Sequence, residues 1–273
     1  MPICFDHKPG LVVYLTSGDP SLSATRDIAI AAIDAGADVI ELGVPFSDPL
    51  ADGPIIQRAM ERALTHGAGH GSGHGGVSLK DVLGLAKEIR AARPIAGLVL
   101  FSYLNPILRH GLANFADDAA AAGIDGVLAT DMIVEEADAY LAELARVHLA
   151  PIFLAAPTSP DGRLKAIAEH SQGFIYAISR TGITGTQSSL NSDAASLVAR
   201  IKRWSKLPVA VGFGISNADH VAQVAEFADA AVIGSAIVEL IARTTSENGP
   251  GEAPGAVARF IKGLRLPQTA LAR

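Results

Sequence analysis

The sequence predicts a single (β/α)8 TIM barrel of the α/β class, spanning residues 1–273. Short apolar runs alternate with stretches of helical periodicity, which is typical of parallel strands joined by crossover helices. About eight such runs occur, and eight strands close a barrel of about 250 residues. The chain has 273 residues, 49% of them hydrophobic, so it can bury one large core. An open, doubly wound sheet is the alternative fold.

The expected strands are short, mainly apolar runs. In chain order they cover residues 11–15, 38–42, 95–101, 126–129, 152–154, 174–178, 209–211 and 231–233. In such a barrel the catalytic groups lie at the carboxyl ends of the strands and in the loops that follow them. Residues that precede strands lie at the opposite face. His148 and His170 precede strands, so they are not expected in an active site.

Helix signals occupy the segments between the strands. Ser21 precedes an expected helix over residues 24–35 with Gly36 at its end, and Ser78 and Asp81 form a capping-box pattern ahead of residues 82–92. Pro54 marks another helix start. The remaining helices are expected over residues 117–122, 135–147, 164–169, 194–204, 219–227, 236–241 and, near the C-terminus, about 255–264.

Composition and charge argue against several classes of protein. The formal net charge is −6 and basic residues are scattered, so nucleic acid is not an expected partner. No stretch approaches the roughly 20 apolar residues of a membrane span. The N-terminus lacks the pattern of a signal peptide, and the one cysteine, Cys4, cannot form an internal disulfide. A cytoplasmic protein with no membrane association is therefore expected.

Two carboxylates carry the strongest functional signal. Glu41 lies at the end of an apolar strand, where a charge is unfavourable unless it is paired or used. Asp52 lies in the following loop, which is rich in proline and glycine and therefore suited to carry function. Two carboxylates in different settings can act as acid and base. The alternative is that Glu41 is a structural acid and that Asp52 caps the helix starting near Pro54.

Two glycine-containing loops near the C-terminus predict a phosphate site. Gly212, Phe213 and Gly214 follow the seventh expected strand, and Gly234 and Ser235 follow the eighth and open a helix. Loops at these positions bind phosphate in many barrels, because glycine allows close approach and a helix N-terminus offers free N–H groups. Ordinary tight turns are the alternative. A third loop, residues 179–185, could close over a substrate as a lid.

Lysine positions narrow the chemistry. No lysine ends an expected strand, so a Schiff-base aldolase is disfavoured. Two other functions stay open at this point. One is a different phosphate-binding barrel enzyme, such as a sugar-phosphate epimerase or indole-glycerol-phosphate synthase, which would need a metal cluster or a catalytic lysine. The other is a regulatory barrel that has lost activity.

The chain resembles the α chain of tryptophan synthase over residues 11–240. The matching motifs are Thr16-x-Gly18-Asp19-Pro20, Glu41-Leu42-Gly43-Val44-Pro45-Phe46-Ser47-Asp48-Pro49 with Asp52-Gly53-Pro54, Tyr103-x-Asn105-Pro106, Ser179-Arg180-x-Gly182-Ile183-Thr184-Gly185, Gly212-Phe213-Gly214-Ile215 and Gly234-Ser235-Ala236. The resemblance implies cleavage of indole-3-glycerol phosphate to indole and glyceraldehyde 3-phosphate. It also implies an α2β2 complex in which indole passes to a pyridoxal-phosphate β chain, with no cofactor in this chain.

The resemblance also implies roles for individual residues. Glu41 matches the residue that moves protons at the indole ring and the glycerol hydroxyl, and Asp52 matches its partner at the indole N–H. Substrate contacts are implied for Tyr176, for Thr184 and Gly185 in the lid, and for Phe213, Gly214, Gly234 and Ser235 at the phosphate. Tyr14, Phe101, Tyr103 and Leu128 are expected to line the indole pocket, whereas Phe153 fits plain barrel core better.

Three features depart from the family pattern. Only ten residues precede the first expected strand, where the family usually has a helix, so the barrel floor is expected to be less covered. Met132 and Ile133 follow Asp131, an aspartate that matches one near the partner interface, in place of residues that include proline. Residues 67–76 form a Gly/His-rich insertion. Because glycine cannot preorganise ligands, we expect a flexible loop there and no metal site.

Overall fold

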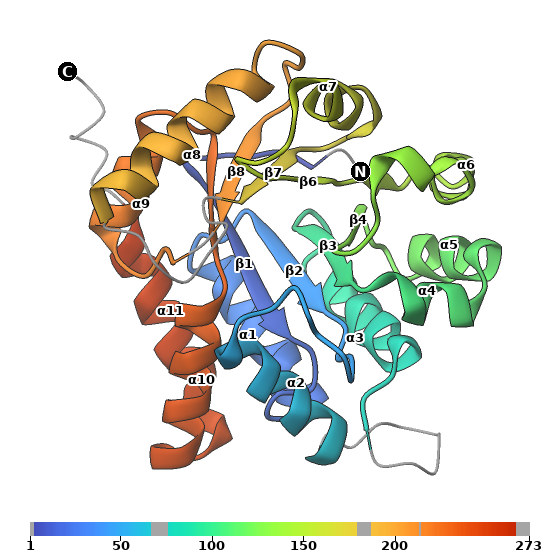
Figure 1. The fold of residues 1–273 in the computed structure, drawn as a ribbon. Coiled ribbons are helices and arrows are strands. Elements are labelled where there is room, and N and C mark those ends of the chain that lie inside the picture. The colour runs from blue at the N-terminus through green and yellow to red at the C-terminus, as the bar shows by residue number, and fades with distance from the viewer. Residues whose placement is uncertain (1–2, 67–75, 179–186, 213, 266–273) are drawn as a thin grey trace.

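The computed structural model describes residues 3–66, 76–178, 187–212 and 214–265, which form a ring of parallel strands surrounded by helices (Figure 1). The strands are β1 (Gly10–Thr16), β2 (Val39–Gly43), β3 (Gly97–Ser102), β4 (Gly126–Ala129), β5 (Ala150–Pro151), β6 (Leu154–Ala155), β7 (Ile175–Ile178), β8 (Val209–Gly212) and β9 (Ala230–Ile233). Every neighbouring pair is parallel, in the order β5-β4-β3-β2-β1-β9-β8-β7-β6.

One continuous segment closes the ring. β5 pairs with β4, β6 pairs with β7, and only two residues separate β5 from β6. These two residues bond to both sides, because Ile152 N–H donates to Val127 and Tyr176 N–H donates to the Phe153 carbonyl. β5 and β6 therefore act as one strand that starts against β4 and ends against β7. The predicted eight-stranded barrel is confirmed, with its fifth strand longer than the expected residues 152–154.

The helices surround the strands (Figure 1). They are α1 (Leu22–Asp34), α2 (Pro54–His66), α3 (Leu79–Ala92), α4 (Leu104–His110), α5 (Leu112–Ala121), α6 (Asp138–Arg146), α7 (Asp161–His170), α8 (Gln187–Ile201), α9 (Ala218–Ala225), α10 (Ser235–Asn248) and α11 (Ala253–Leu264), with short 3-10 turns at Val134–Glu136 and Pro250–Glu252. Two predicted caps are present. The Ser21 hydroxyl accepts from Ala24 N–H, and Ser78 with Asp81 forms the capping box ahead of α3.

Several helices differ from the sequence prediction: α5 begins at Leu112 instead of residue 117, and α8 begins at Gln187 instead of residue 194. α4 was not predicted, because the residues around Pro106 resemble a loop; proline is tolerated in a first helical turn, where its missing N–H has no partner to lose. Its first N–H, from Leu104, is capped from a distant loop by the Asp131 carboxylate at 2.7 Å. α10 continues to Asn248 instead of ending at residue 241, and Thr244 is buried on it.

Two apolar layers hold the barrel together. Strand residues that face outward pack against the helices, whereas inward-facing residues form a second cluster that includes Val12, Val39, Val99, Leu128 and Phe174. Ile3 and Phe5 pack on this inner cluster, and the ring centroids of Phe5 and Phe174 lie 5.9 Å apart. The short N-terminal segment therefore places two apolar side chains against the inner cluster at the floor of the barrel.

Three aspartates link neighbouring strands by hydrogen bonds at the amino ends of those strands. Each lies directly before one strand and accepts a hydrogen bond from the first or second residue of a neighbouring strand. Asp38, before β2, accepts from Leu11 N–H at 2.7 Å; Asp125, before β4, accepts from Leu98 N–H at 2.9 Å; Asp229, before β9, accepts from Val209 N–H at 2.9 Å. The repetition fixes the stagger of three strand pairs.

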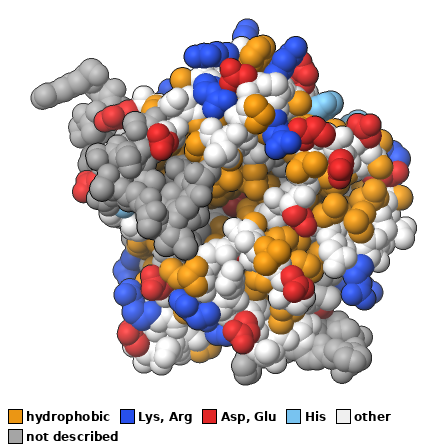
Figure 2. Space-filling model, viewed as in Figure 1, with side chains coloured by type: hydrophobic (Ala, Val, Ile, Leu, Met, Phe, Trp, Pro, Cys, Tyr) orange, Lys and Arg blue, Asp and Glu red, His pale blue; other side chains and the backbone are white. Residues whose placement is uncertain are grey.

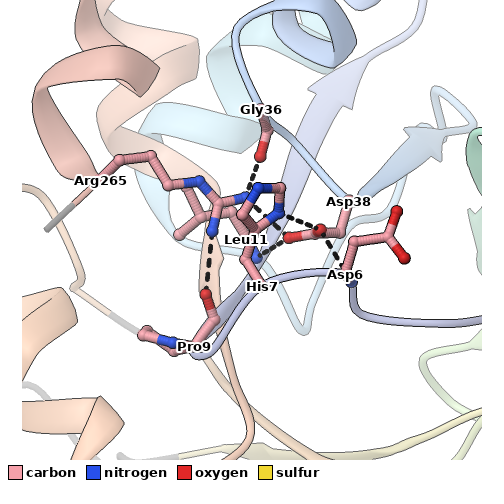
Figure 3. A network of polar contacts seen from close by, with 7 residues as sticks. All are labelled: Asp6, His7, Pro9, Leu11, Gly36, Asp38 and Arg265. Carbon is pink, nitrogen blue, oxygen red and sulfur yellow. Dashed lines mark hydrogen bonds and ion pairs between the residues drawn. The ribbon is translucent and has the colours of Figure 1, made fainter. Parts of the chain in front are cut away.

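A cation neutralises each of these carboxylates. Arg265 lies 2.8 Å from Asp38, Arg90 lies 2.6 Å from Asp125, and Lys202 lies 3.1 Å from Asp229. Figure 3 shows the first group, in which Asp38 also contacts His7, and Arg265 donates to the carbonyls of Pro9 and Gly36. Arg265 follows α11, so this group joins the C-terminal helix to the starts of β1 and β2.

Replacing Asp125 tests whether these groups stabilise the barrel. Asp125→Ala removes the carboxylate that pairs with the Arg90 guanidinium and leaves the buried Leu98 N–H without its acceptor, so the free energy of unfolding should fall by about 2–4 kcal/mol. Urea unfolding measures it. Asp34→Ala is the matched control, because Asp34 also pairs with an arginine, Arg93, but its side chain is 52% exposed. Equal losses in the two variants would contradict a special role for the buried group.

Candidate active site

A cavity of about 380 Å³ opens at the carboxyl ends of the strands. Residues from β1, β2, β3, β6, β7 and β9 form its walls, together with the loops after β2, β4 and β8 and the starts of α2 and α10. The lining residues are Tyr14, Glu41, Ala51, Asp52, Gly53, Ile55, Ile56, Phe101, Thr130, Leu154, Tyr176, Ile178, Gly214, Ile215, Ser216, Val232, Gly234, Ser235, Ala236 and Glu239. In Figure 2, hydrophobic side chains gather around the hollow near the middle of the view, with Lys and Arg mostly toward the edge.

Glu41 is a fully buried acid in the cavity wall. It lies in the middle of β2, where alternation along the strand points its side chain into the barrel, beside Tyr14 of β1 and Val99 of β3. The residue is 0% exposed, and neither carboxylate oxygen has a hydrogen-bond partner among the described residues. Burial raises the pKa of Glu41 to about 8. The side chain therefore holds a proton at neutral pH and can both release and regain it.

Asp52 enters the cavity from the loop between β2 and α2. The Tyr103 hydroxyl donates to its carboxylate at 2.7 Å and accepts from the Ala51 N–H at 2.9 Å. Tyr103 in turn stacks on Phe46, with ring centroids 4.9 Å apart. Burial raises the pKa of Asp52 to about 6, while the bond from Tyr103 lowers it. Within the described residues the carboxylate is thus held by Tyr103 and does not cap α2.

The wall between the two carboxylates and the mouth is mainly apolar. Tyr14 and Phe101 meet edge to face, with ring centroids 5.1 Å apart, and Tyr176 faces the cavity from β7. Leu128 does not reach the cavity: it is fully buried in the inner cluster below. Tyr103 is not among the lining residues and acts on the cavity through Asp52. Phe153 is buried in the outer core, in agreement with the prediction.

The mouth of the cavity has the features of an anion site. Gly214, Gly234 and Ser235 line it, and α10 starts at Ser235. The N–H groups of Ile237 and Val238 bond to the Gly234 carbonyl, whereas those of Ser235 and Ala236 precede any intrahelical acceptor. These free donors, added to the helix dipole, favour a phosphate. Thr184, Gly185 and Phe213, and with them the predicted lid, lie outside the described residues.

Comparison with known proteins identifies the family. The family model described as tryptophan synthase alpha chain matches residues 5–257. The tryptophan synthase alpha chain of Solibacter usitatus is 48% identical over 236 residues, covering 86% of this chain and 85% of that protein. The chain belongs to the tryptophan synthase α chain family. It is accordingly a carbon–carbon lyase of tryptophan biosynthesis that cleaves indole-3-glycerol phosphate.

Solved structures give the same result for the fold. Tryptophan synthase subunit alpha from Legionella pneumophila aligns with a TM-score of 0.83 at 34% identity, covering 94% of this chain and 91% of that one. A tryptophan synthase complex from Pyrococcus furiosus aligns with a TM-score of 0.80 at 34% identity, covering 94% and 98%. Among the described residues, no helix is long and apolar enough to cross a membrane, and no group of three His, Cys, Asp or Glu could hold a metal ion.

Sequence analysis predicted eight of the twenty residues that line the cavity. The lining residues that sequence analysis missed are Ala51, Gly53, Ile55, Ile56, Thr130, Leu154, Ile178, Ile215, Ser216, Val232, Ala236 and Glu239. Strand alternation could have predicted two of these residues in this α chain. Ile178 and Leu154 each lie two residues after an inward-facing residue, Tyr176 and Ile152 respectively. Ile55 and Ile56 lie on a helix whose orientation no local pattern gives.

The raised pKa of Glu41 predicts how the free energy of unfolding depends on pH. The folded state keeps the Glu41 proton up to about pH 8, whereas the unfolded state releases it near pH 4.5. Between these values the unfolded state binds fewer protons, so the free energy of unfolding falls as pH rises. Glu41→Gln cannot titrate. Relative to wild type it should therefore gain up to about 1.4 kcal/mol per pH unit between roughly pH 5 and 8.

Urea unfolding of both proteins at several pH values measures this difference. Glu226→Gln, which makes the same change at an exposed position, serves as the control. A difference from wild type that stays constant with pH for Glu41→Gln would mean that Glu41 is ionised in the folded protein.

Proposed function

We propose that Glu41 carries out the proton transfers by which this chain cleaves indole-3-glycerol phosphate, and that Asp52 stabilises the charge that develops on the indole nitrogen. The observation that supports this most strongly is the cavity itself, in which two carboxylates with separated pKa values face an apolar wall, with a helix N-terminus at the mouth. Such a separation lets one carboxyl group hold a proton at neutral pH while the other stays ionised. The polarity of the cavity also matches the substrate. Its wall is mainly apolar, which suits an indole ring, and its mouth offers N–H donors, which suit a phosphate.

The reaction is a retro-aldol cleavage. Indole carbon 3 gains a proton, the bond from it to the glycerol carbon breaks, and the hydroxyl on that glycerol carbon loses its proton to become an aldehyde. Protonated Glu41 supplies the proton to carbon 3, and the resulting carboxylate accepts the hydroxyl proton, so its charge is restored at the end. No electrons enter or leave, and the steps need only an acid and a base.

Asp52 stabilises the other end of the ring. Protonation at carbon 3 places positive charge on the indole nitrogen, and a carboxylate that accepts the N–H hydrogen bond lowers the energy of that state. With a pKa of about 6, Asp52 is mostly ionised at neutral pH, as this role requires. Tyr103 fixes the carboxylate, so it contributes by holding Asp52 and not by lining the pocket.

The remaining substrate contacts are proposed by position. Tyr14, Phe101 and Tyr176 would enclose the indole ring and the start of the glycerol chain. Gly214, Gly234 and Ser235 would bind the phosphate, and Thr184, Gly185 and Phe213 keep the roles that the resemblance implies. Because Leu128 lies below the cavity, we assign it to the barrel core.

We further propose that the chain works in an α2β2 complex with a tryptophan synthase β chain that carries the pyridoxal phosphate and receives the indole. The Pyrococcus furiosus relative is a tryptophan synthase complex. Three exposed apolar side chains, Leu50 at 92%, Leu108 at 52% and Ile133 at 44%, follow β2, β3 and β4 and so lie toward the face that carries the cavity. This chain itself would need no cofactor, and the exposed, unpaired Cys4 fits a cytoplasmic location.

Replacing the carboxylate tests the assignment of Glu41. Glu41→Gln is nearly isosteric but cannot exchange a proton, so the lyase rate should fall by at least about 10²-fold to 10⁴-fold. Affinity for inorganic phosphate should not change, because the mouth of the cavity is untouched. The control is Glu226→Gln on the surface. A Glu41→Gln chain that cleaves substrate at the wild-type rate would exclude the proposed mechanism and leave a barrel that only binds.

Replacing a glycine tests the phosphate site. An added Cβ at Gly234 meets only ordinary contacts, with Tyr14 at 3.6 Å and Ile56 at 3.8 Å, so Gly234→Asp should fold while placing a negative charge beside the start of α10. We expect affinity for inorganic phosphate to fall by about 10-fold or more through repulsion. Gly84→Asp, at an open position on α3, is the matched control. Unchanged phosphate affinity in Gly234→Asp would place the site elsewhere.

A further inference from the structure

The hydroxyl of Tyr14 is a buried polar group that the steps above do not use. Tyr14 is 3% exposed and lines the cavity, yet its hydroxyl has no hydrogen-bond partner among the described residues. Tyrosine hydroxyls that are buried usually bond to something, because an unpaired one loses its interaction with water and gains nothing in return. A phenylalanine would satisfy a purely apolar wall at this position without that loss.

The unpaired groups of this part of the cavity lie together. Tyr14 and Glu41 are direct partners in the register of β1 and β2, so both side chains enter the barrel at the same level. Both Glu41 oxygens and the Thr16 hydroxyl are also buried and unpaired. Thr16 lies close enough to lower the pKa of Tyr14, although neither hydroxyl reaches the geometry of a full hydrogen bond. Four buried polar atoms in this part of the barrel therefore have no hydrogen-bond partner among the described residues.

Packing alone holds the Tyr14 ring in place. The ring meets Phe101 edge to face at 76°, and a Cβ at Gly43 would lie 2.2 Å from the phenol oxygen. Gly43 thus leaves the space that the hydroxyl occupies. On the other side, a Cβ at Gly234 would lie 3.6 Å from the Tyr14 Cβ. The position of the hydroxyl is therefore fixed without a ligand, while its capacity to donate and accept hydrogen bonds is unused.

The protonation state of this hydroxyl is fixed by its surroundings. Burial raises the pKa of Tyr14 well above its ordinary value, and the charges of Asp52 and Glu41 raise it further. The phenol keeps its proton through the range in which the two carboxylates titrate. It can therefore donate a hydrogen bond at every stage of a reaction at Glu41.

We propose that the Tyr14 hydroxyl donates a hydrogen bond to the substrate hydroxyl oxygen that Glu41 deprotonates. This inference rests on the role of Glu41 proposed above. When the carbon–carbon bond breaks, the proton of that hydroxyl moves to the Glu41 carboxylate and its oxygen becomes the aldehyde oxygen. Tyr14 keeps its own proton throughout and stabilises the negative charge that develops on the oxygen during the transfer.

Tyr14→Phe separates this role from that of an apolar wall, because it removes the hydroxyl and keeps the ring. The value of kcat for cleavage should fall by about 10²-fold, the usual effect of losing one such donor. Affinity for 3-(indol-3-yl)propyl phosphate, which has the ring and phosphate but lacks the hydroxyl, should equal that of wild type. The thermal midpoint should not fall, since the lost hydroxyl has no partner in the protein.

Tyr140→Phe is the matched control. Tyr140 of α6 is equally buried, but its hydroxyl donates to the Val127 carbonyl at 3.3 Å and does not line the cavity. This variant should keep the wild-type kcat. A Tyr14→Phe chain with wild-type kcat, or one that loses affinity for the propyl phosphate as much as it loses kcat, would overturn the proposal.

The activities of Glu41→Gln and Tyr14→Phe separate the role of Glu41 from that of Tyr14. If Glu41→Gln retains activity, the proposed acid–base role is wrong and the Tyr14 role falls with it. If Glu41→Gln loses activity while Tyr14→Phe does not, the Glu41 role stands and only the donor role of Tyr14 is rejected.

Discussion

The carboxylate of Asp38 fixes how β1 and β2 lie against each other, and the active site depends on that alignment. By accepting the Leu11 N–H at the start of both strands, it sets the register that brings Tyr14 beside Glu41. A shift by one residue would turn Glu41 outward into the apolar layer beneath the helices, because strand side chains alternate between faces. Arg265 neutralises this carboxylate from the far end of the chain. The catalytic face is thus aligned from the opposite face of the barrel.

The two faces treat polar groups in opposite ways. At the strand starts, Asp38, Asp125 and Asp229 each have a cation and a backbone donor. At the strand ends, Glu41 and Tyr14 are buried but unpaired within the described residues. Unpaired buried groups lower stability, because they lose their hydrogen bonds to water, and burial also raises the pKa of Glu41. The lower face therefore supplies stability that the upper face gives up in order to keep its polar atoms available for substrate.

Local sequence patterns predicted several features that depend on residues close together in the chain. The strands, the Ser21 and Ser78 caps and the exceptional position of Glu41 all follow from residues a few places apart. Patterns failed where the partner is distant. Leu104 at the start of α4 is capped by Asp131, Tyr103 holds Asp52 across 51 positions, and Ile3 and Phe5 pack against the inner cluster at the floor of the barrel. The sequence analysis placed Leu128 in the pocket wall for a related reason. Whether an inward-facing side chain reaches the cavity or stays in the core depends on how far along its strand it lies, and local patterns do not give that position relative to the cavity.

The two glycines behind the cavity tyrosines restrict how this site can change. A Cβ at Gly43 would lie 2.2 Å from the Tyr14 oxygen, and a Cβ at Gly212 would lie 2.3 Å from the Tyr176 oxygen. At either pair, the glycine cannot enlarge while the tyrosine keeps its place. The order of substitutions is therefore fixed: the aromatic ring must shrink or move first, and only then can the glycine acquire a side chain. Divergence toward another substrate would have to start at Tyr14 or Tyr176, with Gly43 and Gly212 following.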